Sequence, residues 1–361
     1  MSAARPPRLK IVPHAKQAGQ TGAIRETLEA AAADGRALAC FATGRAGALT
    51  RLLACSWGSW ASYGSVRRGA ETAAGQFTAE DLLDVYDVTR IGRDTRLYAL
   101  LGCHVFSSPS PAMHHAAHVA AGLDARYVPV ELDRIEEGLL LIGSHSAAGI
   151  EALAVTMPFK GRAAERSTPA DEISRAAHVV NTVLIRGTEW RGYNTDGPAA
   201  VSLAQAHLDP RGKRVAIAGA GGTGRALAVA FKRAGAHVTL FARDPRRGKG
   251  VASELGVDAL AFERLGEAGW DILINATPLG GDGERIVEAD SLRGRLVLDV
   301  VYSAKPTPLV RDARKRGVTA IDGYELLTTQ AVLQFRLMTG VSPDASRMHA
   351  AGRQWLLARS G

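Results

Sequence analysis

Residues 213–243 read KRVAIAGAGGTGRALAVAFKRAGAHVTLFAR, and this stretch decides the fold. An apolar, strand-like run leads into six residues of which four are glycine, Gly219 to Gly224. A helical pattern then continues to Gly235, and the strand-like HVTLFAR follows. Strand, glycine loop, helix and second strand together form a βαβ unit, which places the loop at the start of the helix.

The glycine spacing predicts a dinucleotide site of the Rossmann type. Gly219 permits a tight turn, Gly221 lets the backbone approach a pyrophosphate, and Gly224 lets helix and strand pack closely. The unpaired N–H groups at the helix start favour a phosphate. A glycine-rich turn without a ligand is the alternative. The predicted cofactor loop consists of Gly219, Ala220, Gly221, Gly222 and Gly224.

The end of the second strand indicates which cofactor binds. An NAD site carries an acidic residue there, whereas this chain has Ala242 followed by Arg243, with Arg246 and Arg247 close behind. Guanidinium groups bind a 2′-phosphate well, so the sequence predicts NADP, with Arg243 and Arg247 as ligands. Asp244 leaves alternatives open, since it can pair with these arginines or accept from a ribose hydroxyl. The loop can also be simply solvated.

Composition narrows the classes of protein. The 361 residues suggest two to three domains, and 46% apolar with 22% charged residues is ordinary for a folded protein. Three scattered cysteines, Cys40, Cys55 and Cys103, suit neither a disulfide framework nor a zinc site, so we expect no metal and a reducing cytoplasm. No signal peptide is expected, because no apolar segment follows the basic MSAARPPR. No membrane span is expected, because charged residues interrupt the most apolar region, 215–242.

The net charge of +8 predicts an anionic partner or an arginine-rich solvated surface. No basic block reaches five residues and no nucleic-acid-binding motif is present. We therefore expect a small anionic molecule rather than nucleic acid.

Residues 8–90 predict three successive β–α units, the pattern of a parallel α/β fold. The expected strands are 9–12, 36–43 and 59–66, and the expected helices are 21–34, 47–54 and 78–88, with Thr21 and Thr78 as N-caps. A second block begins at 96–102, a third at 213, and a closing helix ends at Gly340. The predicted domains are 1–93, 94–200 completed by 322–361, and 201–321.

Residues 96–361 contain eight motifs in this order: SSPSPAMH (107–114), VTMPFK (155–160), VVNTV (179–183), GYNTDG (192–197), GAGGTGRA (219–226), INATPLG (274–280), DVVYSAKPTPL (299–309) and DGYELLTTQAVLQF (322–335). With these motifs, residues 96–361 resemble shikimate dehydrogenase over nearly their whole length. The resemblance implies an α/β substrate domain beside the Rossmann domain. It also implies reversible, NADPH-dependent reduction of 3-dehydroshikimate to shikimate, a step toward chorismate and the aromatic amino acids.

The resemblance also implies roles for individual residues. Lys160 and Asp196 match the catalytic pair, in which an ammonium serves the developing alkoxide and a carboxylate orients it. Taken alone, Lys160 reads as an exposed lysine at a helix start and Asp196 as an N-cap. The implied substrate-binding residues are Ser108, Ser110, Thr156, Asn181, Thr195, Tyr302 and Gln330. Further implied cofactor-binding residues are Asn275, Thr277 and Gly323.

Residues 8–90 contain the stretches KIVPHAK (10–16), LTRLL (49–53), SYGSV (62–66) and ETAAGQFTAEDL (71–82). With these stretches, residues 8–90 resemble the C-terminal part of type I 3-dehydroquinate dehydratase, a (β/α)8 barrel, as in bifunctional proteins of the same pathway. This resemblance implies a vestigial site with Lys10 as the Schiff-base lysine, together with Arg51, Thr72 and Gln76. Three units make only part of a barrel, and no residue matches that family's catalytic histidine, so dehydratase activity is not expected.

The resulting expectation is an NADP-dependent shikimate dehydrogenase that acts on a small molecule as a monomer or homodimer. The alternatives are a quinate/shikimate dehydrogenase, and a bifunctional protein that retains dehydratase activity.

Overall fold

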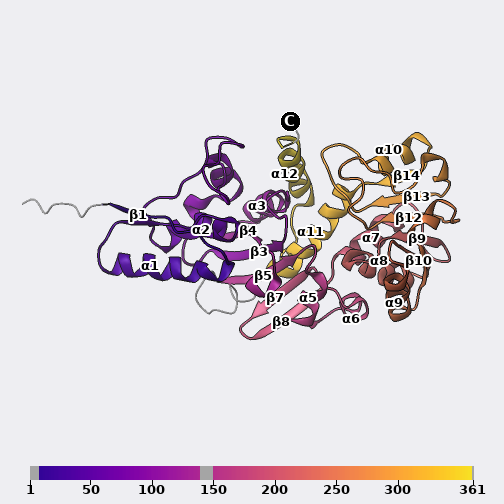
Figure 1. Cartoon of the computed structure of the whole chain (residues 1–361), viewed down its shortest axis with the longest axis horizontal. Helices are drawn as coiled ribbons and strands as arrows, with labels where there is room; N and C mark the ends of the chain where they lie inside the picture. Colours follow the sequence, from indigo (N-terminus) through magenta and orange to yellow (C-terminus); the bar gives the residue numbers. More distant parts are fainter. Residues whose placement is uncertain (1–7, 139–148, 360–361) are drawn as a thin grey trace, which may run out of the picture. The chain divides into compact units, whose positions relative to one another are not determined.

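The computed structural model describes residues 8–138 and 149–359. The chain divides into two compact units, Met1–Phe159 and Lys160–Gly361 (Figure 1). The finer three-domain division expected from the sequence stays a prediction. Among the described residues, no helix is both long enough and apolar enough to cross a membrane.

The second unit contains a six-stranded parallel sheet in the order β11-β10-β9-β12-β13-β14. Its strands are β9 (Arg214–Ala218), β10 (His237–Ala242), β11 (Asp258–Ala261), β12 (Ile272–Asn275), β13 (Leu296–Asp299) and β14 (Thr319–Ile321). In chain order this is 3-2-1-4-5-6, the doubly wound arrangement whose ligand crevice lies at the carboxyl ends of the first and fourth strands. The Rossmann fold predicted from residues 213–243 is confirmed.

Helices cover both faces of this sheet. They are α8 (Gly222–Arg233), α9 (Pro245–Leu255) and α10 (Pro308–Lys315). Figure 1 shows α8 and α9 beside β9 and β10, and α10 beside β13 and β14. Alternate strand residues enter different cores: Ile217 and Leu240 belong to one, Ala216 and Phe241 to the other. A sheet buried on both faces explains the nearly continuous apolar runs in its strands.

The rest of the second unit is a small sheet with five helices. Strands β7 (Thr182–Arg186) and β8 (Glu189–Tyr193) form a hairpin, and β6 (Thr168–Pro169) pairs with β8. The helices are α5 (Lys160–Glu165), α6 (Glu172–Ala177), α7 (Asp196–Gln205), α11 (Gly323–Thr339) and α12 (Ala345–Leu357). The predicted end of the closing helix at Gly340 is confirmed, and Gly340 adopts the left-handed conformation there. Asp322 caps the start of α11.

The first unit contains three parallel strands with β3 between its neighbours β4 and β5. They are β3 (Arg96–Gly102), β4 (Ala125–Glu131) and β5 (Ile150–Val155), and α3 (Ser110–Ala120) packs on β4. Every residue of β4 is buried, as expected for a strand with helices on its faces.

Residues 8–93 of this unit form an N-terminal block of two complete β–α units. Strands β1 (Leu9–Ile11) and β2 (Leu38–Cys40) are parallel, and they are followed by α1 (Thr21–Ala33) and α2 (Ala48–Leu53). Ile24 and Leu28 of α1 pack with Leu38 and Phe41 in a small core. Helix α1 packs on β2, and Figure 1 shows α1 beside β1.

The third unit of this block is reduced. The strand predicted at 59–66 does not form, and only an isolated bridge joins Ser65 to Thr78. Side chains bond to the local backbone groups instead of a neighbouring strand, and the Ser59 hydroxyl donates to the Ala61 carbonyl. The helix after it shortens to Asp81–Val85, although Thr78 accepts from the Asp81 N–H as a cap would.

Thr21 is not the N-cap that the sequence predicted. A short 3₁₀ turn, Ala18–Gln20, precedes α1, and Gln17 and Gln20 cap that turn reciprocally. Thr21 is therefore a buried residue inside a longer helical segment.

The N-terminal block packs directly against the β3–β4–β5 sheet of the same unit. Arg45 forms an ion pair with Glu131 at the end of β4, and Arg126 within β4 lies 2.7 Å from the carboxylate of Asp87. The rings of Phe77 and Phe106 meet edge to face with centroids 5.6 Å apart. Burial raises the pKa of Glu131, and the Arg45 guanidinium opposes that rise.

Candidate active site

The first unit brings three of the predicted substrate residues to one end of its sheet. Ser108 and Ser110 follow β3, and Thr156 follows the adjacent parallel strand β5. The Ser108 hydroxyl donates to Ser110 Oγ at 3.1 Å, and both serines are buried. A Cβ at Gly102 would collide with Thr156 Cγ2, so glycine lets Thr156 pack against the end of β3.

The second unit places Lys160 and Asp196 in contact. Lys160 is the first residue of α5 and Asp196 the first of α7. Lys160 Nζ donates to Asp196 Oδ2 at 2.5 Å, with 11% and 9% of the two side chains exposed. The N-cap of α7 is Thr195 rather than Asp196, and the Asp196 carboxylate accepts from Lys160 and Asn181.

A buried polar network extends from this pair. Asn181 Nδ2 donates to Asp196 Oδ1 at 2.9 Å and to Thr195 Oγ1 at 2.8 Å. The Thr195 hydroxyl donates to Gln330 Oε1 at 3.1 Å, which connects α11 to the pair. Five predicted residues of the second unit are therefore joined in one hydrogen-bonded network. They are Lys160, Asp196, Asn181, Thr195 and Gln330.

The glycine loop has the geometry that its spacing predicts. Gly219 has a φ of 107°, which strongly favours glycine, and a side chain at Gly224 would collide with the Gly219 carbonyl. A Cβ at Gly221 would meet nothing within 4 Å, so this backbone faces open space. Helix α8 has no side-chain cap, which leaves its first N–H groups available to a phosphate. Ala220 and Gly222, both partly exposed, complete this loop.

The arginines after β10 are exposed, and Asp244 has a different role. Asp244 Oδ1 accepts from the backbone N–H groups of Arg246 and Arg247, so it caps α9. Within 8–138 and 149–359, no ion pair engages Arg243, Arg246 or Arg247. Ala242 at the strand end is buried. The alternative of a ribose-binding Asp244 is therefore the weaker one, and the guanidinium groups face solvent.

Asn275 and Thr277 shape the loop after β12. Asn275 Nδ2 donates to Asp299 Oδ1 at 2.9 Å and to the Leu279 carbonyl, while Thr277 donates to Asn275 Oδ1. Burial raises the pKa of Asp299 to about 6. Asn275 is fully buried, so its side chain stabilises the conformation of the loop. Thr277 is partly exposed.

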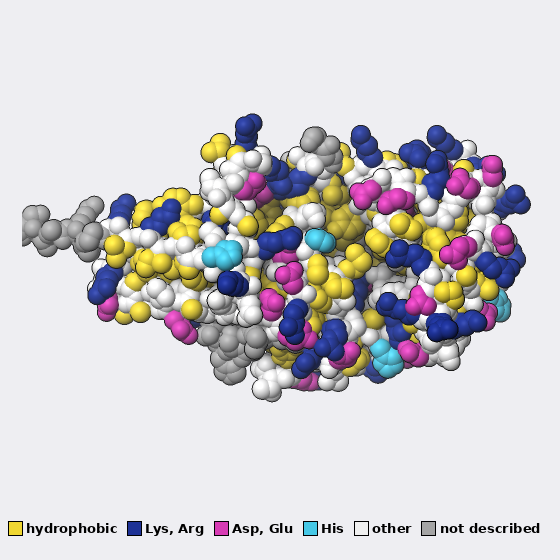
Figure 2. Space-filling view, in the orientation of Figure 1, with side chains coloured by type: hydrophobic (Ala, Val, Ile, Leu, Met, Phe, Trp, Pro, Cys, Tyr) yellow, Lys and Arg dark blue, Asp and Glu magenta, His cyan; other side chains and the backbone are white. Residues whose placement is uncertain are grey.

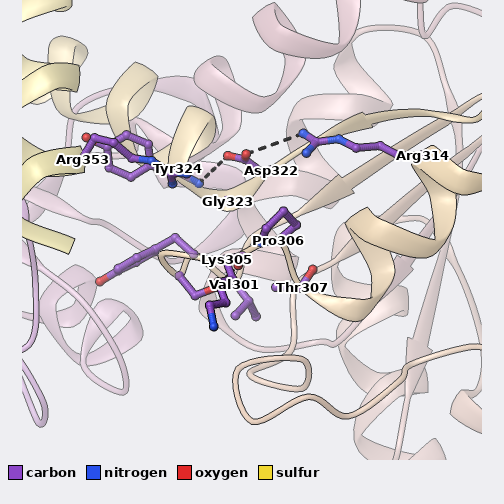
Figure 3. A pocket seen from close by; sticks show the side chains of 11 residues that line it. Val301, Lys305, Pro306, Thr307, Arg314, Asp322, Gly323, Tyr324 and Arg353 are labelled. Atoms are coloured by element: carbon purple, nitrogen blue, oxygen red, sulfur yellow. Dashed lines mark hydrogen bonds and ion pairs between the residues drawn. The ribbon is translucent and has the colours of Figure 1, made fainter. Parts of the chain in front are cut away.

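Tyr302 and Gly323 line one hollow at the carboxyl ends of β13 and β14 (Figure 3). Its other lining residues are Val301, Ser303, Lys305, Pro306, Thr307, Arg314, Asp322, Tyr324 and Arg353. A side chain at Gly323 would collide with the Val301 carbonyl, so only glycine fits there. Figure 3 shows Arg314 directed at Asp322, with 3.7 Å between Nη2 and Oδ2.

The N-terminal block gathers its four predicted residues around Tyr63. Lys10 Nζ lies 3.8 Å from the centre of the Tyr63 ring, and Arg51 Nη1 and Gln76 Nε2 each donate to the Tyr63 carbonyl at 3.4 Å. Thr72 donates to Gln76 Oε1. Arg51 is buried, which lowers its pKa, whereas Lys10 is exposed.

The sequence did not predict three residues of the second-unit network, Thr182, Thr223 and Gln334. Thr223 accepts from Lys160 Nζ at 2.9 Å, and Gln334 Nε2 donates to Thr182 Oγ1 at 3.0 Å. Gln334 lies one helical turn from Gln330 on α11, and that spacing was a readable signal. Thr223 had no such signal, because 63 residues separate it from Lys160.

Charge on the surface is mixed. On the face that Figure 2 shows, Lys and Arg side chains are interspersed with Asp and Glu. In the part of the chain that the structure describes, no group of three or more His, Cys, Asp or Glu is arranged to hold a metal ion.

Comparison with family models finds three matches. The model described as "Shikimate dehydrogenase substrate binding domain" matches residues 100–183. "Type I 3-dehydroquinase" matches residues 5–93, and "D-isomer specific 2-hydroxyacid dehydrogenase, NAD binding domain" matches residues 177–294.

Known proteins match over longer stretches. Shikimate dehydrogenase (NADP(+)) of Methanothrix thermoacetophila is 38% identical over 268 residues, which cover 72% of this chain and 97% of the relative. The structure of shikimate 5-dehydrogenase from Thermus thermophilus, in complex with NADP(H) and shikimate, aligns with a TM-score of 0.65 at 31% identity. That alignment covers 72% of this chain and 100% of the other.

A longer relative matches both parts of the chain. The chloroplastic bifunctional 3-dehydroquinate dehydratase/shikimate dehydrogenase of Arabidopsis thaliana is 31% identical over 322 residues, covering 82% of this chain. The chain spans about half of that relative, 53% of its length. The extent of the match to the single-function relatives, together with the arrangement around Lys160, shows that this chain belongs to the shikimate dehydrogenase family.

Proposed function

We propose that this protein is an NADP-dependent shikimate dehydrogenase that interconverts 3-dehydroshikimate and shikimate. The observation that carries the proposal is the buried Lys160–Asp196 pair, which is tied by Asn181 to Thr195 and Gln330. Burying a charged pair with so few exposed atoms costs desolvation free energy, and buried charged groups of this kind cluster at functional sites.

The residues around Lys160 suit a carbonyl reduction. When bound, NADPH supplies the hydride to the carbonyl carbon. Lys160 donates a proton to the carbonyl oxygen as that oxygen gains charge, and solvent then reprotonates the amine. Asp196 keeps the ammonium oriented, and Asn181, Thr195 and Gln330 offer donors and acceptors for ring hydroxyls. Ser108, Ser110 and Thr156 are proposed to bind the substrate carboxylate and an adjacent hydroxyl.

The chain's own residues fit an NADP molecule. The open backbone at Gly221 and the uncapped start of α8 suit a pyrophosphate. Arg243 and Arg247 are exposed and suit a 2′-phosphate, while the buried Ala242 places no carboxylate against it. Thr277, Asn275 and Gly323 would border the ribose and the nicotinamide.

Location and cofactor preference are proposed from the chemistry of the residues rather than from their contacts. We propose a cytoplasmic location, because all three cysteines are free thiols, and an oligomeric state of monomer or homodimer. A quinate/shikimate dehydrogenase that uses NAD is the nearest alternative, and the exposed arginines after β10 favour NADP over it. The ratios of turnover with NADP to NAD and with shikimate to quinate decide between them.

The test is the absorbance at 340 nm with shikimate and NADP. Wild-type protein should reduce the cofactor, and Lys160→Ala should lower kcat by about 10²-fold or more, because it removes the proton donor. Lys315→Ala is the matched control, since Lys315 is an exposed lysine on α10. Equal kcat for wild type and Lys160→Ala would refute the assignment of Lys160.

A further inference from the structure

Thr223 connects the glycine loop to the lysine of the proposed reaction. Lys160 Nζ donates to Thr223 Oγ1 at 2.9 Å, in addition to its bond to Asp196 Oδ2 at 2.5 Å. Thr223 is the second residue of α8, at the end of the loop that would receive the pyrophosphate. The lysine therefore contacts both the polar network and the predicted cofactor loop.

The approach between the two segments is close along the whole side chain. A Cβ at Gly222 would lie 3.2 Å from Lys160 Cβ and 3.5 Å from Lys160 Cδ. Glycine at 222 thus lets the lysine stem pass the loop and reach the hydroxyl of the next residue. The backbone of Lys160 is anchored separately, because its carbonyl accepts from the Val180 N–H at 3.0 Å.

A lysine ammonium has three N–H donors. Two of them are engaged, one by the Asp196 carboxylate and one by the Thr223 hydroxyl. Because these two bonds fix the orientation of the group, the third N–H has a defined direction in which to meet a substrate oxygen. With Asp196 alone, the ammonium is free to rotate about a single contact.

We propose that Thr223 is a positioning residue that orients the Lys160 ammonium for proton transfer, so that the glycine loop contributes to the reaction as well as to cofactor binding. The proposal rests on the proposed dehydrogenase function. It predicts a change in kcat, whereas a Thr223 that only bound phosphate would change the KM for NADP.

The experiment compares Thr223→Val, which keeps the shape and removes the hydroxyl, with Thr223→Ser, which keeps the hydroxyl. Thr223→Val should lower kcat about tenfold, the effect of losing one hydrogen bond to a charged group, with both KM values within about twofold of wild type. Thr223→Ser should recover most of the lost kcat. Thr319→Val, at an exposed position in β14, is the control.

A second measurement needs no cofactor and no turnover. The rate at which acetic anhydride acetylates Lys160 in the protein alone, read by peptide mass, should rise about threefold in Thr223→Val, since the ammonium loses a hydrogen-bond acceptor. The rate at Lys315 serves as the internal reference. If valine at 223 prevents folding, Thr223→Ala is measured against Thr223→Ser in the same way.

Two results overturn the proposal. One is an unchanged kcat, with or without a raised KM for NADP, and the other is an unchanged acetylation rate at Lys160. A wild-type protein with no shikimate-dependent reduction of NADP would instead refute the proposed function, and the acetylation rates would still decide whether Thr223 engages Lys160.

Discussion

The sequence predicts that two lysines, Lys160 and Lys10, each fall on a catalytic position of a known family, and their surroundings differ sharply. Lys160 is 11% exposed and bonds to the Asp196 carboxylate and the Thr223 hydroxyl. Lys10 is exposed and lies over the aromatic ring of Tyr63. In the described residues, no ion pair or hydrogen bond joins Lys10 to an acid or a base. A matching residue therefore indicates chemistry only when its partners are also in place.

The strongest way to break this contrast is to remove the negative charge beside Lys160. Asp196→Asn keeps the shape and a hydrogen-bond acceptor, and we expect kcat for shikimate oxidation to fall about 10²-fold because the ammonium loses its counter-charge. Steady-state kinetics at 340 nm measure it. Asp282→Asn, at an exposed position, is the control. A fall of less than about threefold would mean that Lys160 works without the carboxylate, as Lys10 would have to.

His118 contrasts with Lys160, because it is buried beside other basic side chains instead of a carboxylate. Burial, together with the cationic side chains of His115, Arg126 and Arg96, lowers the pKa of His118 to about 3. The unfolded chain, with an ordinary histidine pKa near ~6.5, therefore binds more protons, so stability should fall as pH drops below about 6.5 and continue to fall toward pH 3.

His118→Phe tests this sign. Between pH 7 and pH 5, the loss of unfolding free energy should be smaller than in wild type by about 2 kcal/mol, from ~1.4 kcal/mol for each pKa unit. Urea unfolding at the two pH values measures it, and His207→Phe, at an exposed position, is the control. An equal pH dependence in His118→Phe and wild type would show that His118 is not the group responsible.

Arg243 and Arg247 are exposed and, among the described residues, form no ion pair, so they test charge at the cofactor site. Arg243→Ala and Arg247→Ala should each lower kcat/KM for NADP about tenfold, because each removes a charge-assisted contact to the 2′-phosphate, and should leave kcat/KM for NAD nearly unchanged. Arg186→Ala controls for the loss of an exposed arginine. Equal losses with both cofactors would remove these residues from the cofactor site.

The smallest effect is expected at Lys10. Lys10→Ala should leave dehydrogenase kcat within about twofold of wild type, because Lys10 is exposed and its described contacts lie within the N-terminal block. Borohydride reduction in the presence of 3-dehydroquinate should add no mass to the Lys10 peptide. A trapped adduct there, absent from Lys10→Ala, would instead support a retained dehydratase step.

The sequence predicted what is encoded locally. The strand, glycine loop and helix at 213–243 form as expected, because the requirements for a tight turn and for close packing are met within one short segment. The first two N-terminal β–α units also form, since each has its own apolar core residues.

Long-range contacts were beyond reach. Thr223 and Lys160 are distant in sequence and no periodicity connects them, so only folding shows their contact. The strand expected at 59–66 failed for a related reason: a strand needs a partner, and Ser59 and Ser62 instead donate to the carbonyls of Ala61 and Arg51. The sequence left the role of Asp244 open, and the structure shows that its side chain caps α9.

The packing of the N-terminal block on β4 has a consequence for how mutations act. Arg45, Asp87 and Phe77 attach the block to Glu131, Arg126 and Phe106, so the block and the strand share their stabilising contacts. Segments linked in this way open and close together, as one cooperative unit of hydrogen exchange. A substitution in the N-terminal block can therefore reduce the amount of folded protein in a cell, because it loosens β4 as well.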